Sequence, residues 1–373
     1  MTSEALDERT AWVLVGTQKG AFLLSGSSDR QNWSLSGPHL VGAEVFHVTH
    51  DPRDDTLLAA VNHPVWGSQV HVSEDLGQTW ALCSGQPRFS EERGETIERL
   101  WHVAPGRESE PDTWYVGAAP ASLFRTTDRG ATWKEITSLS QHPTRDEWQP
   151  GFGGLCLHSI VLHPADAQRM WVGMSAVGVF GTSDGGSSWH PMNQGVRADF
   201  MPTKFPEFGQ CTHKLLAHPE TPDTLFQQNH CGVYRSDDGG ATWTDISAGL
   251  PSRFGFVLGL HPHDPQTIYV VPEDEADDDT VGGMKRFVTG AKFRVYRSRN
   301  CGQTWETLTR GLPQENAFIH LLREGMATDQ LNPAGIYVGT KAGQVFHSRN
   351  DGDDWLLLWD NLPPVLSVET ATI

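Results

Sequence analysis

Short apolar runs recur along the whole chain, and polar segments rich in Gly, Pro and Asp separate them. The pattern is clearest in HSIVLHPADAQRMWVGMSAVGVFGTSDGGSSWHPM, where apolar runs occupy 158–162, 170–174 and 179–182 and a fourth begins at Trp189. Runs of this length with turn residues between them favour short β-strands over helices. The segment therefore predicts four successive strands, each joined to the next by a turn.

A polar frame marks the third of these turns, and it has the form Ser/Thr-x-Asp-x-Gly-x-x-Trp. Four copies carry Asp, two carry Asn in its place, and a degenerate copy ends at Trp33. The six regular copies begin at Ser73, Thr126, Thr182, Ser236, Ser298 and Ser348. In a tight turn the Ser/Thr and Asp side chains can bond the backbone N–H groups, while Gly takes the positive φ angle. The Trp then opens the next strand and lays its ring over the hairpin.

These frames resemble the Asp-box, or BNR, repeats of sialidase-like and sortilin-like β-propellers. The resemblance covers almost the whole chain, from Trp33 to Trp355. It implies an all-β fold, a seven-bladed β-propeller of four-stranded antiparallel blades, with residues 1–373 in a single domain. In that family the Asp-boxes lie on the face away from the active site, and similar propellers serve as glycosidases, receptors and assembly factors. A ligand site is therefore expected on the face opposite the Asp-boxes.

The Trp residues that end the frames lie 47 to 62 residues apart, which suits one four-stranded blade per repeat. The first repeat lacks an inner strand, because 11–17 reads as its second strand and 20–26 as its third. Residues 366–372 follow the last outer strand and are placed to supply the missing one. Such closure would remove the open edges of the sheets.

Composition agrees with this fold and excludes some functions. Hydrophobic residues make up 38% of the chain, and 38 Gly and 23 Pro favour short strands joined by tight turns. The net charge of -18 would repel phosphate backbones and anionic lipids, so neither nucleic acid nor a membrane is an expected partner. Five Cys in a chain without a recognisable secretion signal predict free thiols and a cytoplasmic location.

Six Cys and His residues are expected in one sector of the mouth, at blades four and five: Cys156, His158, Cys211, His213, His230 and Cys231. The first four form two Cys-x-His pairs that enter the inner strands of neighbouring blades, and residues two apart on a strand share a face. Thiolate and imidazole suit a transition metal, zinc or copper. Two alternatives stay open, a thiolate nucleophile activated by histidine and a structural role for buried side chains.

Further candidates lie on the long connections and strand ends around this sector. The candidate catalytic residues are His158, His213, His230, Asp146 and Glu98. The candidate substrate-binding residues are Arg145, Trp148, Asn229, Gln228, Glu44, Arg99 and His63. Carboxylates, arginines and indole rings around a concave site would suit a small polar or carbohydrate-like ligand.

Sialidase chemistry itself is not predicted. Sialidase-like enzymes use a Tyr nucleophile, but all five Tyr here occupy repeated strand positions, and no Arg-Ile-Pro motif lies near the N-terminus. The prediction is a glycosidase-like hydrolase or lyase, with metal assistance left open. The alternative is a non-catalytic propeller that binds a protein or peptide partner. The acidic run in 272–292 is interpreted as a solvated insertion.

Overall fold

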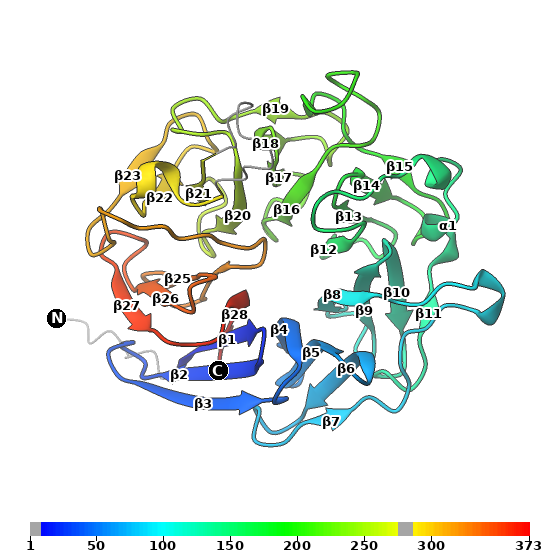
Figure 1. Ribbon diagram of the computed structural model, residues 1–373, viewed down its shortest axis with the longest axis horizontal. Helices are drawn as coiled ribbons and strands as arrows, with labels where there is room; N and C mark the ends of the chain where they lie inside the picture. The colour runs from blue at the N-terminus through cyan, green and yellow to red at the C-terminus, as the bar shows by residue number, and fades with distance from the viewer. Residues whose placement is uncertain (1–8, 275–285) are drawn as a thin grey trace.

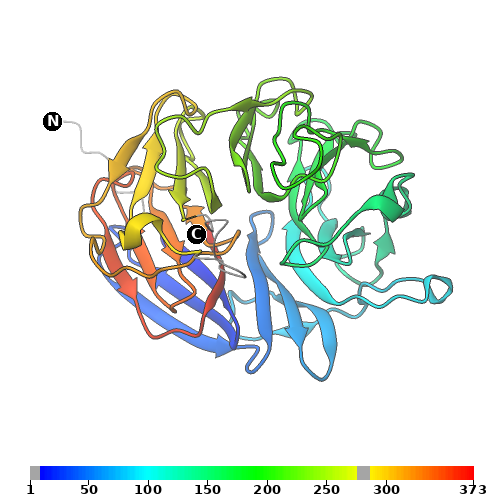
Figure 2. The same cartoon turned by 45° about the horizontal axis from the view of Figure 1, so that its top comes forward.

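The computed structural model describes residues 9–274 and 286–373, whose strands form seven separate sheets arranged in a ring (Figure 1). Each sheet contains four strands, and neighbouring strands within a sheet are antiparallel. In the tilted view the sheets stand around the middle of the ring as separate blades (Figure 2). The predicted all-β fold with seven four-stranded blades is therefore confirmed.

Within each blade the strands follow one another from the inner strand outward. Blade one contains β28 (Val365–Thr372), β1 (Ala11–Thr17), β2 (Gly20–Gly26) and β3 (Trp33–His39). Blade two contains β4 (Glu44–Asp51), β5 (Thr56–His63), β6 (Gly67–Ser73) and β7 (Ala81–Leu82). Blade three contains β8 (Arg99–Pro105), β9 (Trp114–Ala119), β10 (Ser122–Thr126) and β11 (Lys134–Glu135). Blade four contains β12 (Leu157–Leu162), β13 (Met170–Met174), β14 (Gly178–Thr182) and β15 (His190–Pro191).

The remaining blades have the same order. Blade five contains β16 (Thr212–Ala217), β17 (Leu225–Asn229), β18 (Gly232–Ser236) and β19 (Thr244–Asp245). Blade six contains β20 (Gly255–Leu260), β21 (Ile268–Pro272), β22 (Val295–Ser298) and β23 (Glu306–Leu308). Blade seven contains β24 (Met326–Thr328), β25 (Ile336–Gly339), β26 (Val345–Ser348) and β27 (Leu356–Trp359).

Helical structure in the described residues is limited to short turns. They are α1 (Thr137–Ser140) and the 3-10 turns η1 (Glu91–Arg93), η2 (Arg145–Glu147) and η3 (Thr289–Ala291). Within 9–274 and 286–373 no helix has the length and apolar character that crossing a membrane requires. Most of the acidic run predicted to be a solvated insertion lies outside the described residues.

The turns between the third and fourth strands form as the frame predicts. Thr182 Oγ1 donates to Asp184 Oδ1 at 2.8 Å and accepts from the Gly186 N–H at 3.0 Å. Asp184 Oδ1 also accepts from the Ser188 N–H at 2.8 Å, and Gly186 has a φ of 90°. Asn300 Oδ1 accepts the equivalent backbone N–H at 2.9 Å. An amide oxygen therefore replaces the carboxylate oxygen, which explains why the frame tolerates Asn.

The outer strand of blade four begins one residue later than predicted. The fourth strand of blade four was expected to begin at Trp189, but β15 contains only His190 and Pro191. These two residues pair with Gly181 and Phe180, after which the chain leaves the sheet. Trp189 is instead buried, at 3% exposure, in the cluster between blades three and four. Its ring packs between the two blades and does not lie at the edge of a sheet.

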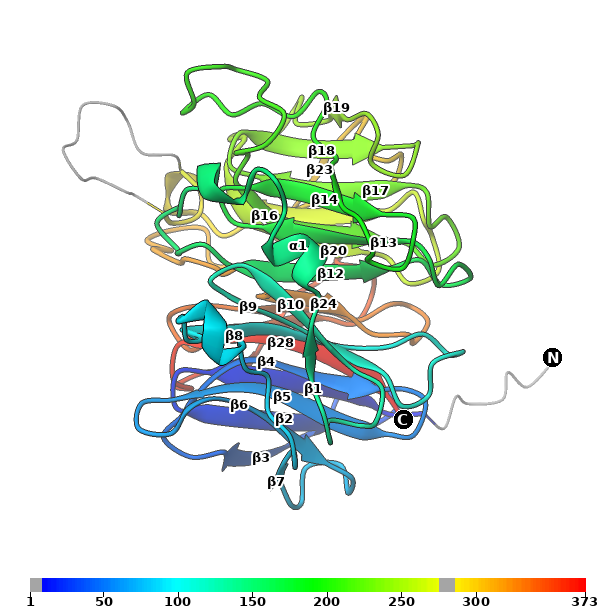
Figure 3. The same cartoon turned by 90° about the vertical axis from the view of Figure 1, so that its right-hand side faces the viewer.

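The ring closes as predicted, through the last strand of the chain. β28 lies beside β1 in Figure 1 and pairs with it from Ala11 opposite Thr372 to Thr17 opposite Val365. In the side view the strands run between two opposite faces (Figure 3). In each blade the repeated turn lies at one face, and the turn that joins the second strand to the third lies at the other. We call this second face the mouth.

Candidate functional site

The inner strands bulge where they reach the mouth. The register between β12 and β13 shifts between Leu157 and Ser159, and the register between β16 and β17 shifts between Thr212 and Lys214. The unpaired residue is a histidine in both strands, His158 in β12 and His213 in β16. A bulge bends a strand and re-aims a side chain, and bulges are frequent beside active sites. The bulges therefore separate these side chains from the regular ladder.

A cavity of about 460 Å³ opens at the mouth between the loops of blades four to six. We call it the mouth cavity. Its apolar surface comes mainly from Phe152, Phe200, Met201, Phe208 and Phe256. Its polar and charged surface includes Glu147, Cys211, His213, His230, Arg286 and Arg323. Aromatic walls with a few convergent polar groups are typical of ligand sites.

Three of the six predicted Cys and His residues meet in this cavity. The ligand atoms of Cys211, His213 and His230 all lie within 4.8 Å of one another. Cys211 Sγ lies 3.5 Å from His213 Nε2. His213 Nδ1 lies 2.6 Å from the Gly255 carbonyl oxygen, so this nitrogen carries the proton and donates it to the carbonyl. Nε2 then keeps its lone pair, directed toward the thiol.

Burial holds these imidazoles in the neutral form. Burial, and then the positive charge of Arg323, lower the pKa of His213 well below its usual range. Burial lowers the pKa of His230 to about 4, and Arg286 acts in the same direction. Both rings are therefore neutral near pH 7, which is the form in which an imidazole binds a metal ion.

Two arginines line the same cavity, and neither forms an ion pair with a carboxylate among residues 9–274 and 286–373, although the charge of Glu273 acts on Arg286. Arg286 lies over the rings of Phe152, Phe254 and Phe256 at 5.7 to 5.8 Å. Arg323 Nη2 donates to Ser175 Oγ at 3.2 Å, and its buried Nε has no hydrogen-bond partner in the same part of the chain. Burial, and then the charge of Arg323, lower the pKa of Arg286. Among the described residues that line the mouth cavity, two arginines therefore outnumber the one carboxylate, Glu147, in a strongly acidic protein.

A second polar cluster, which the sequence did not predict as a site, lies on the inner strands. Its members His47, His102 and Glu324 have ligand atoms within 4.8 Å of one another. The Lys214 ammonium is hydrogen-bonded to Glu324, and both side chains are 6% exposed. Burial alone would raise the pKa of Glu324, but Lys214, His102 and His47 together outweigh burial and lower that pKa well below its usual range. The signal was weak, because His47 and His102 occupy a repeated strand position.

The other three Cys and His candidates lie outside the mouth cavity. Both ring nitrogens of His158 already have partners, the Thr212 carbonyl oxygen at 2.9 Å and Ser159 Oγ at 3.1 Å. Cys156 is fully buried, and burial raises the pKa of its thiol to about 11. Cys231 Sγ accepts from the Asp199 N–H at 3.4 Å. The expected convergence of six side chains is thus reduced to three.

Two of the predicted substrate-binding residues hold loops in place. Gln228 Nε2 donates to the carbonyl oxygens of Asn229 and Arg253 at 2.9 and 3.1 Å. Asn229 Oδ1 accepts from the Cys231 N–H at 3.2 Å. Both side chains are almost fully buried. These residues shape the loop that carries His230 and do not line the mouth cavity.

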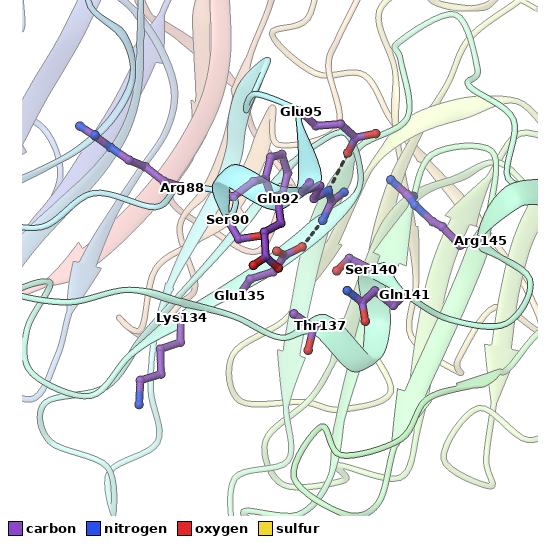
Figure 4. A pocket seen from close by; sticks show the side chains of 12 residues that line it. Arg88, Ser90, Glu92, Glu95, Lys134, Glu135, Thr137, Ser140, Gln141 and Arg145 are labelled. Atoms are coloured by element: carbon purple, nitrogen blue, oxygen red, sulfur yellow. Dashed lines mark hydrogen bonds and ion pairs between the residues drawn. The ribbon is translucent and has the colours of Figure 1, made fainter.

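Trp148 and Arg145 were expected to line the ligand site and lie elsewhere. Trp148 is 5% exposed and packs on Phe180 with ring centroids 5.2 Å apart. Arg145 lines a separate groove of about 730 Å³ at the outer side of blade three (Figure 4). In that groove Glu95 and Glu135 are joined through Arg93, as the dashed lines in Figure 4 show. Asp146, between the two candidates, is not among the residues that line the mouth cavity.

The remaining candidates lie outside the mouth cavity. Glu44 and Arg99 line a smaller cavity of about 190 Å³, which shares Arg323 with the mouth cavity. Glu98 is exposed and does not line either cavity. His63 Nδ1 accepts from the backbone N–H groups of the turn after β5, both at 3.1 Å. All five cysteines lie outside disulfide bonds, as predicted.

Comparison with known proteins gives distant relatives. No protein-family model matches the chain. It is 23% identical over 263 residues to a xyloglucanase of a Paenibacillus species, covering 64% of this chain and 24% of that protein. It is 22% identical over 308 residues to a probable oligoxyloglucan-reducing end-specific xyloglucanase of Neosartorya fischeri, and the match covers 73% of this chain and 34% of that protein. The chain thus spans about a quarter to a third of the length of these relatives.

Solved structures share the fold at low sequence identity. A GH74 enzyme of Niastella koreensis has a TM-score of 0.61 and 17% identity, covering 96% of this chain and 51% of that one. YCF48 of Cyanidioschyzon merolae has a TM-score of 0.57 and 14% identity, covering 87% and 88%. These similarities show the propeller fold.

Proposed function

We propose that this propeller is a glycosidase-like hydrolase or lyase that acts in the mouth cavity on a small sugar carrying a carboxylate or another anionic group. The observation that carries the proposal is the pair of arginines, Arg286 and Arg323, which line one cavity and form no ion pair with a carboxylate of the described residues. Desolvating a charge without a partner costs free energy. An anionic ligand would offset that cost, and the guanidinium group matches a planar carboxylate.

The aromatic walls support a carbohydrate as the ligand class. Phe152 and Phe200 line the cavity and are 86% and 49% exposed, so their faces are available to a ring-shaped ligand. The similarity to xyloglucanases points to the same class, although this name describes those proteins. The positive charge at the cavity is what favours an acidic sugar over a neutral one.

The reactive groups favour elimination over hydrolysis within this proposal. Most glycosidases use two carboxylic acids about 5 to 9.5 Å apart, whereas Glu147 is the single carboxylate among the described residues of the cavity lining. Elimination next to a sugar carboxylate needs one base. His230, a neutral imidazole in the cavity lining, would take the proton. The C–H electron pair would form a C=C bond, and the leaving oxygen would depart with the electrons of the broken C–O bond.

The test is turnover on matched substrates, acidic oligosaccharides and the same oligosaccharides with their carboxyl groups reduced to alcohols. We expect turnover of the acidic series alone, with the ultraviolet absorbance of an unsaturated product for elimination or a new reducing end without it for hydrolysis. Arg286→Met should lower turnover at subsaturating substrate by about 10-fold or more, and Arg310→Met, at a side chain 76% exposed, should leave it unchanged. Equal turnover of the neutral series, or none of either, would contradict the proposal.

A second candidate function is docking of a protein or peptide without chemistry. The observation that favours it is the exposure of Phe152, at 86%, on the rim of the cavity, because exposed aromatic residues are typical anchors of interfaces. Under this alternative, Phe152→Ser would weaken binding of a partner, and no sugar of either series would be turned over.

A further inference from the structure

We propose that Cys211, His213 and His230 bind a zinc ion in the mouth cavity. One thiolate and two imidazoles are a ligand set that zinc prefers. Their ligand atoms lie within 4.8 Å of one another, and all three side chains line the cavity. The role of such an ion in catalysis rests on the proposed function, whereas its binding does not.

The spacing of the thiol and the imidazole matches a tetrahedral metal site. Zinc binds sulfur at about 2.3 Å and nitrogen at about 2.0 to 2.1 Å, so tetrahedral ligands of these types lie about 3.5 Å apart. Cys211 Sγ and His213 Nε2 are separated by 3.5 Å. The two atoms therefore need little movement to share an ion.

The orientation of His213 is fixed before any ion arrives. Its Nδ1–H donates to the Gly255 carbonyl oxygen at 2.6 Å, which is the contact that metal-binding histidines usually make with their second nitrogen. Its ring stacks on Phe256, with centroids 4.5 Å apart and an interplanar angle of 14°. Phe254 packs edge-to-face against both imidazole rings, with its ring centroid 5.5 Å from that of His213 and 5.0 Å from that of His230.

The second cluster, on the inner strands, shows what makes the mouth cluster different. His47, His102 and Glu324 are as close together, but the Lys214 ammonium already pairs with Glu324. A metal ion there would have to displace a buried cation from its carboxylate. In the mouth cluster, by contrast, the Cys211 thiol faces the Nε2 lone pair of His213 directly. Ligand types alone do not distinguish the clusters, but the position of the lysine does.

The three protein ligands leave one tetrahedral position for solvent or substrate, which is the arrangement of catalytic zinc sites. Arg286 and Arg323 line the same cavity and would repel a bare cation. The thiolate offsets part of that repulsion, and an anionic fourth ligand would offset more. A hydroxide in that position would replace His230 as the base, while the arginines would hold the anionic group of the substrate.

The test is zinc binding by the full-length protein under reducing conditions, measured by elemental analysis and by titration against a competing chelator. We expect about one zinc per chain in the wild type. Cys211→Ser and His230→Gln should each weaken zinc binding more than about 100-fold, since even outer-shell changes cost 10 to 100-fold. Cys301→Ser removes a buried thiol from a repeated turn and should leave zinc binding unchanged.

Cobalt provides a second readout, because a thiolate bound to cobalt gives an intense ultraviolet charge-transfer band. The band should appear in the wild type, in Cys301→Ser and in Arg286→Met, and should be missing in Cys211→Ser. Zinc binding that survives both ligand variants, or a reduced wild type that binds no zinc at micromolar concentration, would overturn the inference. Arg286→Met separates the zinc site from the proposed function, since this variant should bind the acidic substrate more weakly and still bind the metal.

Discussion

The two faces of this propeller treat polar side chains in opposite ways. At the repeated turns each polar group finds its partner within a few residues, as Thr182 Oγ1 does with Asp184 at 2.8 Å and with the Gly186 N–H at 3.0 Å. At the mouth, within the part of the chain that the structure describes, Arg286 contacts aromatic rings and Arg323 has a buried Nε without a partner. The same blades carry both faces, so the difference is not imposed by the fold.

That difference separates residues that build the ring from residues that serve a ligand. A turn whose polar groups form hydrogen bonds within the turn contributes to folding. It tolerates a side chain with an equivalent hydrogen-bond acceptor, as Asn300 shows. A partly buried pair of arginines without an ion-pair partner among the described residues contributes nothing to folding that an apolar pair would not. Changes to ring-building groups should therefore alter stability, and changes to the mouth arginines should alter ligand binding.

The closing strand should be essential for folding. Deleting residues 366–373 removes nearly all of β28 and leaves the edge of β1 unpaired in blade one. We expect aggregation or loss of the cooperative unfolding transition, measured by circular dichroism during heating. A truncated protein that stays soluble and melts cooperatively would show that closure does not hold the ring together.

Lys214 should stabilise the fold although it lies among the inner strands near the mouth. Lys214→Met would leave Glu324 buried without its cation, which typically costs about 3 to 5 kcal/mol of unfolding free energy. Urea denaturation would measure the loss. The exposed Lys204→Met is the control and should change stability by less than about 0.5 kcal/mol. Adding Glu324→Gln to Lys214→Met should restore part of the loss, and no recovery would contradict the pairing.

Arg286 should contribute to ligand binding and not to stability. Arg286→Met should weaken binding of an acidic oligosaccharide by about 1.5 to 3 kcal/mol, the usual worth of a hydrogen bond to a charged group. Its melting temperature should equal or exceed that of the wild type, because no ion pair to a described residue is lost. Calorimetric titration and thermal unfolding would measure the two effects. A marked fall in melting temperature would assign Arg286 to the fold.

The smallest effect is expected at the turns and depends on pH. Hydrogen bonds from Thr132 and Thr126 lower the pKa of Asp128 to about 2, and those from Ser188 and Thr182 do the same for Asp184. Because the folded pKa is depressed, the stabilisation is present above the unfolded value of about 3.9 and is lost as pH falls toward 2. Asp128→Asn with Asp184→Asn should therefore flatten the acid dependence of melting, with a lower melting temperature at pH 7 and little change near pH 2.

The fold was predictable because its signals are local and repeated. The frame around Asp184 fixes a turn by contacts within four residues, and the chain contains the frame several times. Closure was predictable for the same reason, since blade one visibly lacked a strand. The outer strands were mispredicted at Trp189 because a ring that packs between blades has the same apolar pattern as one on a strand.

The site was predictable in part, where sequence neighbours share one strand. Cys211 and His213 lie two residues apart, and the loop with His230 follows the next strand. The sequence did not mark Arg286 and Arg323 as site residues, because they lie on separate loops and belong to no repeated motif. Only the closed ring brings them into one cavity. Trp148 was predicted to line the ligand site because it lies on a long connection outside the repeat. Its ring is in fact buried, at 5% exposure.

Anion binding by the two arginines of the mouth cavity is tested most directly by calorimetric titration of the wild-type protein. The titrants are a uronic acid disaccharide and its carboxyl-reduced neutral counterpart. We expect measurable binding of the acidic sugar and binding of the neutral one weaker by about 10-fold or more, which corresponds to about 1.4 kcal/mol. Equal affinity for the two sugars, or the same acidic affinity in Arg286→Met and Arg323→Met, would contradict a role for these arginines in anion binding.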